Sequence, residues 1–345
     1  MDIAKGLAML LVLYGHGLGV FVGGANREFV FEQLKIIYAF HMPVFFMLSG
    51  MVFTARRWAE TLRRALSLLL TAYIVHLLCW VYGAAMHEGP VNWAGLIRPL
   101  LELRQFWSVI VWFLAALALV QTVYFAAITA GRWGRIVIIG LVVAAFVWAQ
   151  GRRSNVFELS ALLPGLVFYG LGHALAHAGV LWRVGRRHGA VIAGLALATV
   201  WLAGLNGGCA GDAAGTCDNL PGAFIVLMIA GQYGFLPLFL AAALAGSALV
   251  LGLARLIELH HAWSAAALAW VGRRSLQLLV INGLLIFFLH PVLEPAWQDA
   301  GRWWTEVGAL GLVAGQLLVA WLFAGITSAP LRLAKFLVAR VPALR

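Results

Sequence analysis

The chain has 345 residues, of which 63% are hydrophobic and 11% are charged, and its mean hydropathy is +0.94. Soluble domains are about a quarter charged, so this composition excludes a water-soluble globular protein and predicts an all-α polytopic membrane protein. The formal net charge of +11 would suit nucleic acid, but the basic residues lie in short loops between apolar runs. That pattern is typical of membrane orientation, so we expect membrane lipids, and no nucleic acid, as partners.

Apolar runs of about twenty residues predict about ten transmembrane helices. The run over 136–149 is short for a span, and the run over 223–253 is too long for one straight helix. Within the long run, the stretch AGQYGFLP predicts a break or a re-entrant piece, because glycine and proline interrupt helices. The other runs are 3–22, 35–53, 66–82, 109–129, 159–178, 190–205, 276–289 and 307–328.

The distribution of basic residues predicts the orientation of the spans. Sixteen Lys and Arg residues fall on one side and seven on the other. Because positively charged loops stay in the cytoplasm, we expect both termini to be cytoplasmic. The first apolar run lacks a convincing small-residue cleavage site, so we expect it to be a retained span. The expected division is a transmembrane domain over 1–330 and a basic cytoplasmic tail over 331–345.

The chain has three cysteines. Cys79 falls within a predicted span, whereas Cys209 and Cys217 share one loop on the predicted outer side. That compartment permits a disulfide between Cys209 and Cys217, and the sequence leaves open whether the two are bridged.

The first predicted helix carries three polar residues on one stripe. At about 100° per residue, Asp2, Lys5 and His16 fall within roughly a 60° arc. A charged side chain at the centre of a membrane helix costs about 2.5 to 3.5 kcal/mol or more, so such groups need protein or water around them. Asp2 and Lys5 could instead snorkel toward the interface, and His16 could be a structural histidine bonded to a neighbouring helix.

A second polar segment, FHMPVFFMLSG, lies in the next predicted span. His41 and His16 are each about six residues from the outer ends of antiparallel helices, so we expect them at similar depth. Pro43 removes a backbone donor and predicts a kink below His41. His41 then has two interpretations, a catalytic role or a hydrogen bond to the backbone that Pro43 frees. Ser49 with Gly50 leaves room for close helix packing or for a ligand.

Five segments carry a resemblance to a known family. They are DIAKGLAMLLVLYGH, FHMPVFFMLSG, WFLAALALV, LLPGLVFYGLG and VGRRSL, in this order along the chain. Together they resemble the acyltransferase 3 family of bacterial membrane proteins, and the fucose 4-O-acetylase-like members most of all. The first two segments are specific, whereas the later three are weak when taken singly.

The resemblance implies a membrane domain of roughly ten helices in the bacterial inner membrane. Its expected activity is transfer of an acyl group, usually acetyl from acetyl-CoA, to a hydroxyl of an extracytoplasmic glycan or lipid-linked sugar, without a metal. By position, His16 matches the essential histidine of the family, and Lys5 matches the basic residue of the same motif. Asp2, His41 and Ser49 match other recurrent positions.

The chain departs from the family pattern at two places. Many members have an arginine and a proline in a stretch resembling RLLxPY on the third helix, where this chain has LSLLLTAY with Leu68 and Ala72. Asn282 stands where many members have a histidine after the serine and leucine of VGRRSL. We therefore assign no second histidine role to Asn282.

The spacing along the first helix suggests how an acyl donor would bind. Lys5 and His16 are eleven residues apart, which is about 16.5 Å along a helix and about 20° in rotation. This length is comparable to an extended phosphopantetheine arm, so we expect Lys5 to bind phosphate near the cytoplasmic face, oriented by Asp2. We also expect Arg63 and Arg64 to contribute to acyl-CoA binding. His16 would act as the general base toward the acceptor hydroxyl.

Alternatives to this mechanism and function stay open at the level of sequence. The acyl group could pass through a covalent intermediate on His16 or Ser49. About ten spans with a broken helix would also suit a transporter of a lipid-linked sugar or small solute. The concentration of polar residues at the start of the chain, and the lack of two matching halves, favour the enzyme.

The charge asymmetry can be tested by labelling in intact cells. A single cysteine introduced at Ala59 or Arg186 should resist a membrane-impermeant thiol reagent, whereas one at Glu88 should react, with the unmodified protein as control. Labelling at Ala59 from outside would invert the predicted topology.

Overall fold

The computed structural model describes residues 1–345 except 55–56, 87–91, 104–105, 107, 152–157, 180–184, 186–187, 208–223, 298 and 342–345. Cys209 and Cys217, and the labelling positions Glu88 and Arg186, lie outside the described residues. The described residues are overwhelmingly helical, and their only β pairing is an isolated bridge between Leu227 and Gln232.

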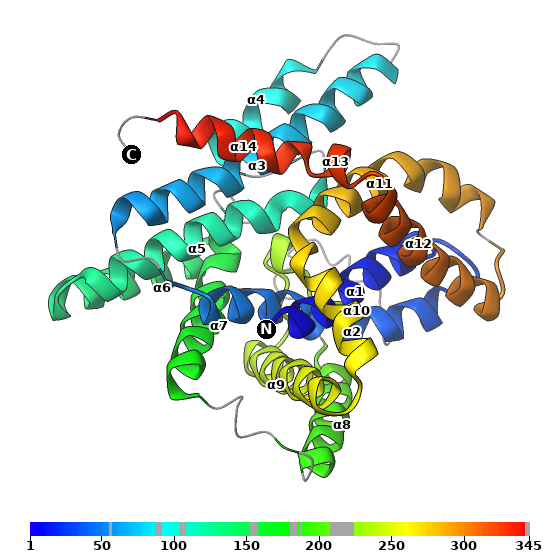
Figure 1. The fold of residues 1–345 in the computed structure, drawn as a ribbon, viewed down its shortest axis with the longest axis horizontal. Coiled ribbons are helices and arrows are strands. Elements are labelled where there is room, and N and C mark those ends of the chain that lie inside the picture. The colour runs from blue at the N-terminus through cyan, green and yellow to red at the C-terminus, as the bar shows by residue number, and fades with distance from the viewer. Residues whose placement is uncertain are drawn as a thin grey trace.

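The helices follow one another in a bundle, with short connections between most of them (Figure 1). Their bounds are α1 (Asp2–Gly19), α2 (Arg27–Met51), α3 (Trp58–Met86), α4 (Trp93–Glu102), the 3-10 helix η1 (Val109–Val111), α5 (Trp112–Thr129), α6 (Arg132–Gly151), α7 (Leu159–Ala178), α8 (Gly189–Leu205), the 3-10 helix η5 (Met228–Ala230), α9 (Leu236–His260), α10 (Ala262–Arg273), α11 (Ser275–Ala296), α12 (Arg302–Leu322), α13 (Ala324–Thr327) and α14 (Ala329–Ala339).

Within the described ranges, seven helices are long and apolar enough to cross a membrane, or eight if the pair α10 and α11, bent by 66°, counts as one span. The seven are α2, α3, α5, α6, α7, α9 and α12, and α8 is apolar but shorter. The predicted class, an all-α multi-pass membrane protein, is therefore confirmed. The count of about ten spans and the cytoplasmic position of both termini stay predictions.

The predicted interruption before α9 is confirmed. Residues 224–235 form a turn instead of extending the helix, with Gly231 and Gly234 at φ of 70° and 64°. Two interactions fix this turn to neighbouring elements. The Tyr233 hydroxyl donates to the Ser160 carbonyl at 2.6 Å, and Asn206 Nδ2 donates to the Tyr233 carbonyl at 2.9 Å.

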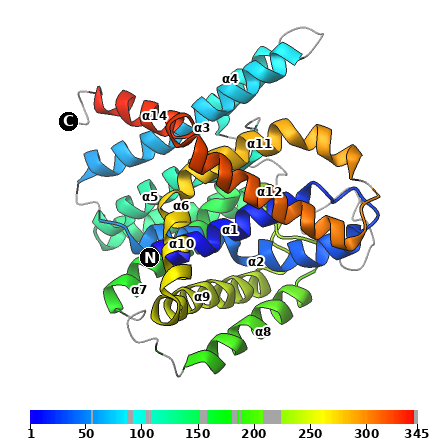
Figure 2. The same ribbon diagram turned by 45° about the vertical axis from the view of Figure 1, so that its right-hand side comes forward.

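Helix α1 lies in the interior of the bundle, packed against α2, α9, α10, α11 and α12 (Figures 1 and 2). Its contact with α10 depends on two glycines. A Cβ on Gly6 would lie 2.1 Å from the Leu268 carbonyl oxygen, and one on Gly272 would lie 1.8 Å from the Asp2 carbonyl oxygen. Larger side chains at either position would push the two helix backbones apart.

Helices α2 and α7 cross in the same way. A Cβ on Gly50 would lie 1.9 Å from the Tyr169 carbonyl oxygen, and a Cβ on Gly172 would lie 2.0 Å from the Met47 carbonyl oxygen. Gly50 therefore serves close helix packing, one of the two uses predicted for the Ser49–Gly50 pair. Helix α14 runs beside α3 in both views, so this part of the expected tail is a helix docked on the bundle.

We expect Gly50→Ala to destabilise the protein by about 1 to 3 kcal/mol, because overpacking at a tight crossing forces the backbones apart. Gly140→Ala on α6 is the matched control, since a Cβ there would have nothing within 4 Å. Thermal unfolding in detergent should show a lower midpoint for Gly50→Ala and an unchanged or slightly higher one for the control. Equal midpoints for the two variants would contradict the crossing.

Candidate active site

A cavity of about 250 Å³ contains both histidines predicted from the sequence. His16 of α1 and His41 of α2 line it, together with Tyr38 of α2. Residues 226–229 of the turn before α9 also line it. The sequence predicted that His16 and His41 would lie at similar depth, and the structure brings them to one cavity, which we call the histidine cavity.

His16 has a hydrogen-bond partner on a distant part of the chain. Its Nδ1 lies 2.6 Å from Oδ1 of Asn282 on α11. Its ring also meets the Tyr38 ring edge to face, with centroids 6.3 Å apart. His16 is partly exposed, and it lines the cavity, so its ring is held on one side and open on the other.

His41 is buried, with only 4% of its surface exposed. Its Nδ1 donates to the carbonyl of Ile37 at 3.0 Å, one turn earlier on α2. The carbonyl that Pro43 leaves without its helical donor is that of Ala39, so the observed partner differs from the one that the sequence suggested. The centroid of the Tyr38 ring lies 4.6 Å from that of the His41 ring. Tyr38 therefore contacts the rings of both histidines.

A larger cavity of about 370 Å³ carries the positive charge. Lys5 of α1, Arg64 of α3 and Lys335 of α14 line it, and Ser49 of α2 and Ser275 of α11 add hydroxyl groups. We call it the cationic cavity. Arg64 also donates from Nη2 to the Thr54 hydroxyl at 3.0 Å.

The cationic cavity has a buried amide in its wall. Gln121 of α5 is 7% exposed and lines the cavity, and its Nε2 has no hydrogen-bond partner among the described residues. A buried donor without a partner costs about 1 to 3 kcal/mol, so a polar ligand beside it would be stabilised.

The two cavities adjoin each other along α1. Val12, Met42 and Leu279 line both of them, and each of these side chains is at least nine-tenths buried. The cationic cavity therefore meets the histidine cavity at an apolar junction. Lys5 lines only the cationic cavity and His16 lines only the histidine cavity, so one helix presents both side chains to the adjoining cavities.

Two of the predicted site residues lie elsewhere. Asp2 makes its ion pair with Arg273 of α10, at 4.0 Å, and no ion pair with Lys5 is present although both residues are described. Arg63 is exposed and does not line either cavity, whereas its neighbour Arg64 does.

Three residues of the site were not identified from the sequence. Asn282 replaces a histidine of the family pattern, so the pattern assigns it no role, yet it contacts His16 directly. Lys335 belongs to the basic tail expected from the sequence, and the docking of α14 on α3 brings it to the cavity. Gln121 had no signal in the sequence, because one glutamine in an apolar helix is unremarkable.

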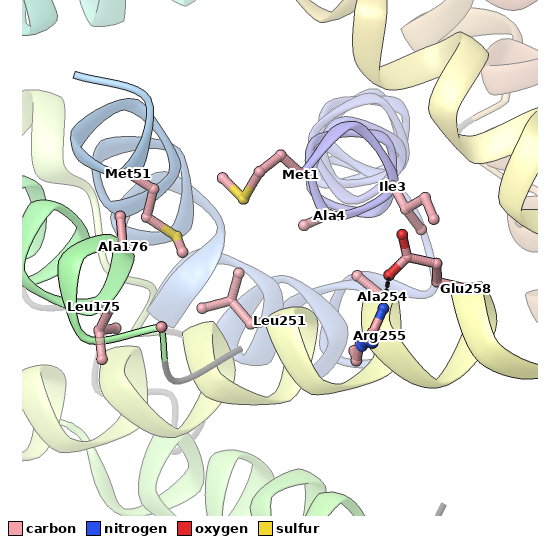
Figure 3. Close-up of a pocket in the computed structure, with 11 residues that line it drawn as sticks. Met1, Ile3, Ala4, Met51, Leu175, Ala176, Leu251, Ala254, Arg255 and Glu258 are labelled. Carbon is pink, nitrogen blue, oxygen red and sulfur yellow. Dashed lines mark hydrogen bonds and ion pairs between the residues drawn. The ribbon is translucent and has the colours of Figure 1, made fainter. Parts of the chain in front are cut away.

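A third cavity, of about 200 Å³, lies between the start of α1 and the ends of α2, α7 and α9 (Figure 3). It contains the ion pair of Arg255 with Glu258, at 2.5 Å, and is otherwise mainly apolar. None of the predicted site residues lines it. Within the described part of the chain, no group of three or more His, Cys, Asp or Glu side chains could hold a metal ion.

The five segments that carry the family resemblance converge on the two adjoining cavities. The first two segments supply Lys5, His16, His41 and Ser49, and the remaining three supply Trp112, Tyr169 and Ser275, among others. No curated protein and no solved structure matches the chain. A family model described as an acyltransferase domain matches residues 1–325. The chain therefore belongs to the acyltransferase 3 family of membrane proteins.

Proposed function

We propose that this acyltransferase moves an acyl group, in the first instance acetyl from acetyl-CoA, to a hydroxyl of an extracytoplasmic glycan or lipid-linked sugar. We further propose that it works in the bacterial inner membrane, with Lys5 toward the cytoplasm. The observation that carries the proposal is the adjoining pair of cavities, one with three cationic side chains and the other with two histidines.

The cationic cavity suits the phosphate end of acyl-CoA. Lys5, Arg64 and Lys335 come from three different helices, so a polyanion between them would be contacted from several sides. The sequence lacks the arginine that many family members have on the third helix, and Leu68 lines the cavity at that place. Arg64 and Lys335 supply positive charge to the same cavity that Leu68 lines.

The space between the cationic end and His16 suits the arm of the donor. The arm has methylene groups that can pack against the apolar junction of Val12, Met42 and Leu279. It carries amide groups, and the unpaired Nε2 of Gln121 is a suitable donor for an amide oxygen. Eleven residues of helix, about 16.5 Å, would separate the phosphates from the thioester.

At the far end, the reaction needs a base and a hydroxyl. His16 would accept the proton of the acceptor hydroxyl while its oxygen bonds to the thioester carbonyl carbon. The carbon–sulfur bond then breaks, and the proton passes from His16 to the departing thiolate. The products are the O-acyl ester and free CoA thiol, so atoms and charge balance without a metal.

We expect His16→Ala to lower kcat for acyl transfer by a factor on the order of 10² or more, with donor binding retained. Lys5→Ala should instead raise the KM for acyl-CoA on the order of tenfold and change kcat much less, because a phosphate contact far from the carbonyl contributes uniform binding. Steady-state transfer by purified protein, with detergent-solubilised acceptor, measures both effects. A normal rate in folded His16→Ala protein would end the proposed mechanism.

The assignment of Lys335 can be tested against a neighbour on the same helix. Lys335→Ala should raise the KM for acyl-CoA about two- to fivefold, since an exposed charge contributes up to about 1 kcal/mol. Arg332→Ala is the control, because Arg332 donates to the Gly325 carbonyl and lines neither cavity. Raising the salt concentration should reduce the difference between the two variants. Equal KM values at low salt would remove Lys335 from the donor site.

A further inference from the structure

A chain of hydrogen bonds links His16 to two other helices. Nδ1 of His16 on α1 lies 2.6 Å from Oδ1 of Asn282 on α11. Nδ2 of Asn282 in turn donates to Oε1 of Gln316 on α12, at 2.8 Å. The three residues are far apart in sequence, so the tertiary fold alone brings them into one line.

The two amides are buried. Asn282 is 0% exposed and Gln316 is 2% exposed. Amides are costly to bury in an apolar bundle unless they are hydrogen-bonded. Asn282 is bonded through both its oxygen and its nitrogen, whereas Gln316 is bonded through Oε1 and its Nε2 has no partner among the described residues. Asn282 is thus held between His16 and Gln316.

The orientation of Asn282 decides which nitrogen of His16 carries the proton. In the structure Asn282 presents its NH₂ group to Oε1 of Gln316, which can only accept, and its oxygen to His16. That oxygen also can only accept, so Nδ1 of His16 must be the donor. A neutral imidazole has one N–H, which leaves the lone pair on Nε2.

The lone pair is therefore on the nitrogen that Asn282 does not contact. Because Nδ1 is engaged with α11, Nε2 is the nitrogen available to the histidine cavity that His16 lines. The other titratable groups facing this cavity are His41 and the Tyr38 hydroxyl, both from α2. No Asp, Glu, Lys or Arg is among the described residues that line it.

We propose that Asn282, oriented by Gln316, is a positioning residue that keeps the proton of His16 on Nδ1 and so makes Nε2 the atom that accepts the proton of the acceptor hydroxyl. This inference rests on the proposed role of His16 as the base. The amide itself takes up no proton. Its oxygen accepts from Nδ1–H before, during and after transfer, while only Nε2 gains and loses a proton.

A neutral amide suits this place better than a carboxylate. A carboxylate next to His16 would add a negative charge to a cavity that has no cation in its described lining. It would also stabilise the protonated ring, which is the form that cannot act as a base. The amide of Asn282 fixes the tautomer without adding a charge to the cavity and without stabilising the protonated ring.

The test compares Asn282→Leu with Asn282→Asp, each in full-length purified protein. Asn282→Leu removes the acceptor, and we expect kcat to fall by a factor on the order of 10² with the donor KM unchanged within about twofold. Asn282→Asp keeps an acceptor for Nδ1–H. It should retain most of the maximal rate, with the rising limb of the pH–rate profile moved to higher pH because the carboxylate stabilises the imidazolium.

Gln277→Leu is the matched control. Gln277 is a buried amide on the same helix, α11, and it bonds Thr327 of α13 at 2.5 Å without contacting His16. We expect this variant to lower stability while leaving kcat per folded molecule and the pH profile unchanged. A purely structural role for Asn282 would make Asn282→Leu behave as Gln277→Leu does.

The tautomer itself can be measured in the unmodified protein. Nitrogen-15 NMR of histidine-labelled protein in micelles should show the His16 proton on Nδ1, with the resonance identified by its loss in His16→Gln. In Gln316→Leu, where Asn282 loses its orienting acceptor, the two tautomers should become mixed. This measurement keeps the inference testable even where Asn282→Leu does not fold.

Two results would overturn the inference. One is a proton on Nε2 of His16 in the unmodified protein, and the other is a normal kcat in folded Asn282→Leu. Either result with an inactive His16→Ala variant would leave the proposed function intact. A fully active His16→Ala variant would remove the proposed function instead, whatever the state of Asn282.

Discussion

The constraint on which this structure depends is the cost of polar groups in an apolar medium. Helix α1 carries Lys5, Tyr14 and His16, and a helix with these side chains cannot face hydrocarbon cheaply. Its position among five other helices removes that cost. Tyr14 illustrates the point, because its hydroxyl lies 2.6 Å from both Gln33 of α2 and Glu306 of α12. The surrounding helices thus supply hydrogen-bond partners to Tyr14 and His16 of α1.

Enclosing one helix this tightly needs close backbone approach, and glycine supplies it. In a membrane the helices gain little by hiding apolar surface from lipid, so packing contacts must be close to be worth anything. Gly6 and Gly272 allow α1 and α10 to touch, and Gly50 and Gly172 do the same for α2 and α7. These two crossings hold the segments that present Lys5 and Ser49 to one cavity. The positions of Lys5 and Ser49 in the site thus depend on glycines that let the helix backbones approach closely.

Local features of the chain were predictable, and contacts between distant elements were not. The polar stripe of α1 and the break before α9 follow from periodicity and from glycine and proline, which act within a few residues. The pairing of Asn282 with His16 depends on the 66° bend between α10 and α11, which no local pattern encodes. Lys335 is similar, since its place in the site depends on α14 folding back onto α3. The sequence could not distinguish Arg63 from Arg64. Adjacent residues of a helix point their side chains about 100° apart, and which of the two faces the cavity depends on how the helix packs.

Helix α1 presents the cationic side chain of Lys5 to one cavity and the imidazole of His16 to the other. The cations lie at one end, the histidines at the other, and buried apolar side chains lie between them. A thioester held beyond this junction would be away from the bulk water that surrounds the cationic end, and its competing hydrolysis would be reduced. Lys5 and Arg64 do not line the histidine cavity, and under the proposed mechanism a cation near His16 would oppose the protonated ring that the base role requires. Under the proposed mechanism His16 gains and loses a proton, and the groups next to it suit that role because they are neutral: the Asn282 amide, which is itself bonded to Gln316, and the Tyr38 ring.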